Sequence, residues 1–137
     1  MGFIARNIVV ASLQWGIWRI DVKVLSFGEI IWDVYPDKSC IGGAPLNFAA
    51  HVAKNGAESY LVSCIGNDRL GKEAMQRIAK FGVKDDFVST CDRQTGICKV
   101  TLDANAVPTY TIVDDVAYDY IGFENKLLQT KHYLYSP

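Results

Sequence analysis

The stretch Gly42–Ala49, which reads GGAPLNFA, is the most informative part of this sequence. Two adjacent glycines let a ligand approach the backbone closely, and Pro45 suits the first turn of a helix, where its missing N–H is not needed. The start of a helix also offers unpaired N–H donors, and Asn47 can both donate and accept hydrogen bonds. The stretch therefore predicts a helix that begins near Pro45, preceded either by a tight turn alone or by a binding site. It is not a dinucleotide or Walker-type motif.

Asp33 lies ahead of this stretch and is the carboxylate that a site for a polyhydroxyl ligand would need. It follows the expected first strand, at the carboxyl edge where open α/β sheets bind ligands. A carboxylate accepts hydrogen bonds from two neighbouring hydroxyls, which suits a neutral sugar. The residue types alone leave a second interpretation equally open, in which Asp33 is a solvated turn residue before Pro36.

The segments around this stretch alternate between strand and helix patterns. Val22–Phe27 is rich in β-branched and aromatic residues and predicts a buried strand, and Ser59–Ile65 predicts a second. The first helix is expected to close at Asn55-Gly56, and Asp68 can cap a second helix that ends at Gly82. The apolar stripe of that helix consists of Leu70, Ala74, Ile78 and Phe81. This order predicts an α/β fold with a mostly parallel sheet covered by helices.

The pattern changes after this second helix. Ile97–Leu102 and Thr109–Val113 alternate apolar and polar residues, which predicts an antiparallel β-hairpin with one face in water. A hairpin added to a parallel sheet often serves as a lid or an interface, and we call residues 95–113 the lid hairpin. Phe123–Lys131 is expected to form a short helix, and His132–Tyr135 to begin a strand.

The composition is that of an ordinary globular protein with one domain. The 137 residues include 14 Lys and Arg against 15 Asp and Glu, and a net charge of −1 without a basic cluster gives no electrostatic basis for binding nucleic acid. No apolar run approaches the roughly 20 residues of a membrane-spanning helix. The four cysteines form no C-x-x-C pair, so we expect reduced thiols in the cytoplasm and no metal site.

Residues 1–21 do not match the pattern of the rest of the chain. A charged start followed by the apolar run Ile8–Ala11 has the outline of a signal peptide, but Gln14 follows the run and no small-x-small cleavage site is present. We interpret residues 1–21 as an N-terminal extension outside the fold, with export as the alternative. The domain is then expected to occupy residues 22–137.

Several motifs together resemble the ribokinase/PfkB family of carbohydrate kinases. Gly42–Ala49, with the glycines that follow it, resembles the first signature of that family at every fixed position. Phe27–Asp33 is similar to the first-strand motif of fructokinases, and Gly66–Gly71 is similar to the family's Gly-x-Asp-x-x-Gly loop. Gln94–Ile112 is similar to the fructokinase lid. The resemblance covers residues 22–121, with Tyr118 where such proteins usually have Trp.

The resemblance implies a ribokinase-like fold and a sugar, fructose first, as the substrate. It implies ATP and Mg²⁺ as the cofactors of the complete enzyme, and a homodimer through the lid hairpin as one arrangement. The substrate contacts that it implies are Asp33, Gly42, Gly43, Asn47, Thr95 and Tyr110.

The family's second signature, Asp-Thr-x-Gly-Ala-Gly-Asp, does not occur in this sequence. The resemblance assigns the catalytic base and the anion hole to that signature, so we expect no catalytic residue in this chain. We interpret the chain as the substrate-binding half of an ATP-dependent sugar kinase. A non-catalytic sugar-binding or dimerising module and a decayed fragment are the alternatives, and the choice between fructose, another sugar and a nucleoside stays open.

Overall fold

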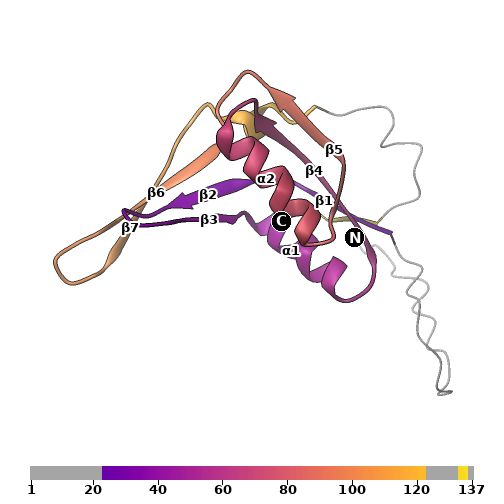
Figure 1. The fold of residues 1–137 in the computed structure, drawn as a ribbon, viewed down its shortest axis with the longest axis horizontal. Coiled ribbons are helices and arrows are strands. Elements are labelled where there is room, and N and C mark those ends of the chain that lie inside the picture. The colour runs from indigo at the N-terminus through magenta and orange to yellow at the C-terminus, as the bar shows by residue number, and fades with distance from the viewer. Residues whose placement is uncertain (1–22, 123–132, 136–137) are drawn as a thin grey trace, which may run out of the picture.

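The computed structural model describes residues 23–122 and 133–135, which form two four-stranded sheets with helices beside them (Figure 1). The first sheet has the order β5-β4-β1-β8, and the second has the order β3-β2-β6-β7. The first consists of β1 (Lys23–Phe27), β4 (Glu58–Gly66), β5 (Lys84–Cys91) and β8 (Tyr133–Tyr135). The second consists of β2 (Ile31–Val34), β3 (Ser39–Gly42), β6 (Gly96–Leu102) and β7 (Pro108–Ile112). The helices are α1 (Ala44–Lys54), α2 (Arg69–Lys80) and the 3-10 helix η1 (Ala117–Tyr120).

The first sheet is parallel, as the strand and helix order predicts. β1 pairs with β4 and with β8, and β4 pairs with β5, all in parallel. The expected strand at His132–Tyr135 is thus confirmed as β8, whereas the expected helix at residues 123–131 lies outside the described residues. Both α1 and α2 cover one face of this sheet. The main core between them consists of Ile30, Trp32, Leu46, Ala49, Leu61, Ile65, Ala74, Ile78 and Val83.

The end of α2 differs from the predicted apolar stripe. Phe81 is the last residue of that stripe, but it caps the helix and is 40% exposed. Gly82 reverses the chain with a φ of +74°, and Val83, which donates to the carbonyl of Ile78, occupies the buried position instead. The apolar residue just beyond a glycine cap commonly packs back on the helix in this way.

The lid hairpin is confirmed as β6 and β7, but it extends the second sheet and not the parallel one. β2 and β3 form an antiparallel hairpin, and β6 pairs in parallel with the other edge of β2. The tight turn after β2 places β3 along one edge of β2. The other edge of β2 stays open, and β6 of the lid hairpin pairs there. In Figure 1 this sheet projects to one side, away from α2 and the first sheet.

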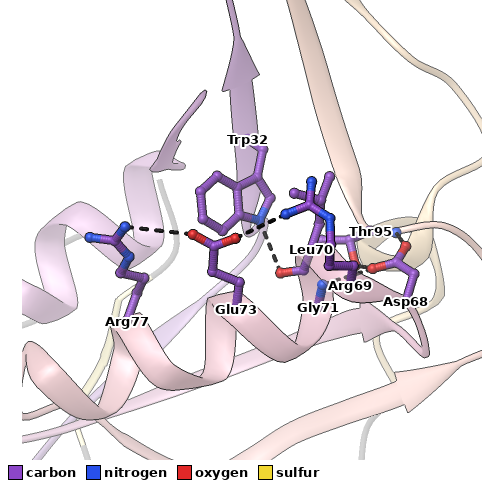
Figure 2. Close-up of polar contacts among 8 residues, drawn as sticks. All are labelled: Trp32, Asp68, Arg69, Leu70, Gly71, Glu73, Arg77 and Thr95. Carbon is purple, nitrogen blue, oxygen red and sulfur yellow. Dashed lines mark hydrogen bonds and ion pairs between the residues drawn. The ribbon is translucent and has the colours of Figure 1, made fainter. Parts of the chain in front are cut away.

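Asp68 connects the two sheets (Figure 2). Its carboxylate accepts from the N–H of Gly71 at 2.7 Å, which confirms the predicted cap of α2. It also accepts from the N–H of Thr95 at 2.8 Å and from Thr95 Oγ1 at 2.7 Å. Burial raises the pKa of Asp68, but the hydrogen bonds from Thr95 and Gly71 outweigh it and hold the pKa below its usual range. One carboxylate thus holds the start of α2 to the start of β6.

Trp32 makes a second connection between the sheets. Its side chain is 1% exposed, and its indole N–H donates to the carbonyl oxygen of Leu70 at 3.2 Å (Figure 2). This contact binds the inner face of β2 to the first turn of α2. The ring therefore packs in the core, which leaves it unavailable for stacking on a ligand.

Replacing Asp68 with Asn should lower the free energy of unfolding by about 1–3 kcal/mol, because an amide cannot accept all three hydrogen bonds. Thermal unfolding at pH 7 measures this loss. Since the pKa of Asp68 is lowered by folding, its ionised form stabilises the protein fully only above the unfolded pKa of about 4. The difference between wild type and Asp68→Asn should therefore shrink as the pH falls below about 4.

Glu73→Gln is the matched control for this substitution. Glu73 pairs with Arg69 at 3.3 Å and with Arg77 at 3.5 Å along α2, and all three side chains are partly or largely exposed (Figure 2). Such solvated ion pairs contribute less than about 1 kcal/mol each, so the control should unfold close to the wild type. Equal melting temperatures for the two variants would contradict the role given to Asp68.

Candidate substrate site

Asp33 lies within β2 and not in the turn that follows it. Its side chain is half-buried, and the turn is closed farther on, where the N–H of Tyr35 donates to the carbonyl of Lys38 at 2.8 Å. The Asp33 carboxylate points toward Gly42 on β3, because one of its oxygens lies 3.9 Å from the position that a Cβ on Gly42 would occupy. Asp33 and Gly42 are thus brought together, and Asp33 lies on the same face of the second sheet as its cross-strand neighbours Cys40 and Cys98.

Cys98 is a member of this site that the sequence did not indicate. It stands opposite Asp33 in the parallel pairing of β6 with β2, it is 5% exposed, and its thiol faces the Asp33 carboxylate. Burial, and then the negative charge of Asp33, raise the pKa of the Cys98 thiol. The thiol therefore stays protonated at neutral pH and can donate toward the carboxylate. Only the register between β2 and β6 places these two residues together.

Gly43 is required by a close contact inside the protein. Its φ is +111°, and a Cβ here would lie 2.4 Å from the carbonyl oxygen of Glu29. The side chain of Glu29 accepts from the N–H of Ala44 at 3.0 Å and so caps the start of α1, where Gly43 itself has no side chain to do so. A carboxylate is favourable at this end of a helix because the helix dipole is positive there.

Asn47 lies in the first turn of α1 but is separate from Asp33 in the described contacts. Its backbone N–H donates to the carbonyl of Gly43 at 2.9 Å, and its side chain is exposed. It borders a hollow of about 420 Å³ between α1 and the end of α2. The other residues that line this hollow are Ala50, His51, Lys54, Lys80 and Phe81. The structure therefore places Asn47 beside this hollow, and its contact with a substrate stays a prediction.

Thr95 and Tyr110, the two expected contacts near the lid, differ in their surroundings. Thr95 is fully buried, and its hydroxyl is engaged by Asp68 and by the N–H of Gly66. Its hydroxyl therefore supports the loop, and a contact of Thr95 with a ligand stays a prediction. Tyr110 is 57% exposed on β7, opposite Val100. Burial, and then the neighbouring Tyr110 and Asp33, raise the pKa of Tyr35. The strand register places Tyr110 on the face that carries Asp33.

The described residues also bear on metal binding and on membranes. Within residues 23–122, no group of three or more His, Cys, Asp and Glu side chains is arranged to hold a metal ion. None of the helices in that part of the chain is both long and apolar enough to cross a membrane. The cysteines Cys40, Cys64, Cys91 and Cys98 are free thiols.

Known proteins are similar to this chain in sequence and in fold. The family model of pfkB family carbohydrate kinases matches residues 16–135. An ATP-dependent 6-phosphofructokinase of Thermoanaerobacterium thermosaccharolyticum is 30% identical over 115 residues, which cover 76% of this chain and 35% of that protein. The structure of a fructokinase from Vibrio cholerae matches 71% of this chain and 36% of its own, with 26% identity and a TM-score of 0.67.

An uncharacterized sugar kinase from Pyrococcus horikoshii, solved in complex with ATP, matches 69% of this chain and 35% of its own, with 31% identity and a TM-score of 0.63. The chain spans between 25% and 38% of the length of the curated relatives that it matches. Its described part has the ribokinase-like fold of these neighbours. The family match over most of the sequence, together with this fold, shows that the chain belongs to the PfkB family of carbohydrate kinases.

Proposed function

We propose that this chain is the substrate-binding part of an ATP-dependent sugar kinase of fructokinase type, which phosphorylates a sugar hydroxyl in the complete enzyme. The observation that carries the proposal is the half-buried Asp33 carboxylate, which lies beside Gly42 and opposite Cys98 on one face of the second sheet. Family membership and the fructokinase neighbours support the sugar class, and the ATP complex of the Pyrococcus horikoshii sugar kinase supports ATP. Fructose is the substrate we propose first.

In the proposed site, sugar hydroxyls donate to Asp33, and the Gly42-Gly43 backbone lies against the ligand. Asn47 and Tyr110 complete the contacts from α1 and from the lid hairpin. The lid would exclude water, so that the sugar hydroxyl and not water receives the phosphoryl group. ATP would supply that group, and the catalytic base, the anion hole and Mg²⁺ are assigned to residues outside this chain. The chain itself binds and orients the sugar.

We also propose a homodimer through the lid hairpin. The lid exposes large apolar side chains, of which Leu102 is 54% exposed and Ile112 is 58% exposed. Strand alternation and the register of β6 with β7 place both on the face that carries Asp33. A second copy seated there would cover these side chains and close the substrate site.

We also propose that the protein is located in the cytoplasm. The free cysteines support a location in this reducing compartment.

Asp33→Ala should weaken the binding of fructose to this chain by more than tenfold. Removing a charged partner from a buried polar contact costs about 1–3 kcal/mol or more, and about 1.4 kcal/mol corresponds to a factor of ten. Isothermal titration with fructose measures the affinity. Asp37→Ala is the matched control, because Asp37 is exposed in the turn after β2. Equal affinities of wild type and Asp33→Ala would rule out this site.

The 137-residue chain alone should transfer no measurable phosphoryl group from ATP to fructose. Catalysis of this transfer depends on positioning and on charge stabilisation, and we assign half of that apparatus to residues that the chain lacks. A coupled assay for ADP measures the turnover. A rate of about 1 s⁻¹ or more, as in ordinary kinases, would refute this division of labour.

Leu102→Lys should convert a dimer of this chain into a monomer, because a charge would be buried in the proposed interface. Light scattering after size-exclusion chromatography measures the mass. Thr101→Lys is the control, since the adjacent residue points to the opposite face of β6 and should leave the dimer intact. A wild-type chain that is monomeric at all concentrations would exclude the dimer.

A further inference from the structure

Tyr118 lies against the second sheet on the same face as Asp33. It belongs to η1, just after the lid hairpin, and its ring packs over Gly96, where a Cβ would lie 2.6 Å from Cε1 and 2.7 Å from Cδ1. Gly96 is two residues before Cys98 on β6, so both positions face the same side of the sheet. Because Cys98 stands opposite Asp33 in the pairing of β6 with β2, the ring of Tyr118 lies beside the proposed sugar site.

The surroundings of the Tyr118 hydroxyl are polar and acidic. Burial, and then the charges of Asp119, Glu29 and Asp114 with a smaller effect of Cys98, raise the pKa of Tyr118, so its hydroxyl keeps its proton at neutral pH. The side chain is half-buried, and its hydroxyl has no hydrogen-bond partner among residues 23–122. A protonated phenol in this position is a donor that the described fold leaves available.

Three of the side chains around this site give a sugar no good donor. Asp33 only accepts, Glu29 accepts from the N–H of Ala44, and the Cys98 thiol is a weak donor that faces Asp33. A sugar carries acceptor oxygens as well as hydroxyl protons, so a site made of carboxylates alone would satisfy only part of it. Among these four side chains, Tyr118 is the one that can donate to a sugar oxygen.

We propose that Tyr118 is a further substrate-contacting residue, which donates its phenol O–H to an oxygen of a sugar held by Asp33. This inference rests on the proposed function of the site. The ring and the hydroxyl have separate roles in it, since packing over Gly96 needs only the ring. A substitution that removes only the hydroxyl of Tyr118 therefore tests the ligand contact while the packing of the ring is kept.

Tyr118→Phe should weaken fructose binding about three- to tenfold, the effect of one hydrogen bond lost, while the melting temperature stays that of the wild type. Isothermal titration of fructose into the full 137-residue chain measures the affinity. Tyr120→Phe is the matched control in the same short helix: its hydroxyl donates to Asp115, and its loss should leave fructose affinity unchanged.

Fructose affinities that are equal for wild type and Tyr118→Phe would overturn the role of Tyr118 while leaving the proposed function intact. A wild-type chain that binds no fructose would overturn the proposed function, and the role of Tyr118 with it. A loss of affinity that is equal in Tyr118→Phe and Tyr120→Phe would assign the effect to the helix as a whole and would also refute the contact.

Discussion

The hydrogen bonds between Asp68 and Thr95 are the constraint on which the rest of the structure depends. They join residues 27 positions apart in the chain. Thr95 Oγ1 also accepts a hydrogen bond from the N–H of Gly66 at 3.0 Å. The glycines of the loop permit this approach: a Cβ on Gly66 would lie 2.3 Å from the carbonyl oxygen of Arg93, and one on Gly71 would lie 2.1 Å from that of Gly66. Because β6 begins beside Thr95, this junction sets where the second sheet stands relative to the first.

Two carboxylates near the start of α1 have different tasks because of their partners. Glu29 is committed to the backbone of the protein, since it caps α1 at Ala44 and its carbonyl packs against Gly43. Asp33 is two residues beyond Ile31, the first residue of β2, and the Cys98 thiol faces it from β6. One carboxylate therefore fixes the helix while the other remains able to accept from a ligand. The proposed function follows from this division.

The sequence predicted the elements whose signals are local. The glycines and Pro45 located the start of α1, and Asp68 was recognised as a helix cap, because both signals lie within one turn of what they control. β5 was missed, since its start, Lys84-Asp85-Asp86, is exposed and polar and reads as a solvated loop. The second sheet was missed for another reason: whether a hairpin joins one sheet or another depends on pairing between distant strands.

The same limit applies to the candidate site. Asp33 and Gly42 were singled out from their residue types and lie together, whereas Thr95 was expected to touch the ligand and is buried in the Asp68 junction. Cys98 carries no signal of its own in the sequence, and Tyr118 was noted only as standing where the family usually has Trp. Only the parallel register of β2 with β6 and the packing of η1 over Gly96 place them on the face that carries Asp33.

The most direct test of this account is a map of backbone amide shifts during a titration of the ¹⁵N-labelled chain with fructose. If the second sheet and the start of α1 enclose the sugar, the largest changes will occur at Asp33, Gly43, Gly96 and Tyr118. Changes confined to the hollow between α1 and α2, at His51 and Lys80, or no changes at all, would contradict the account.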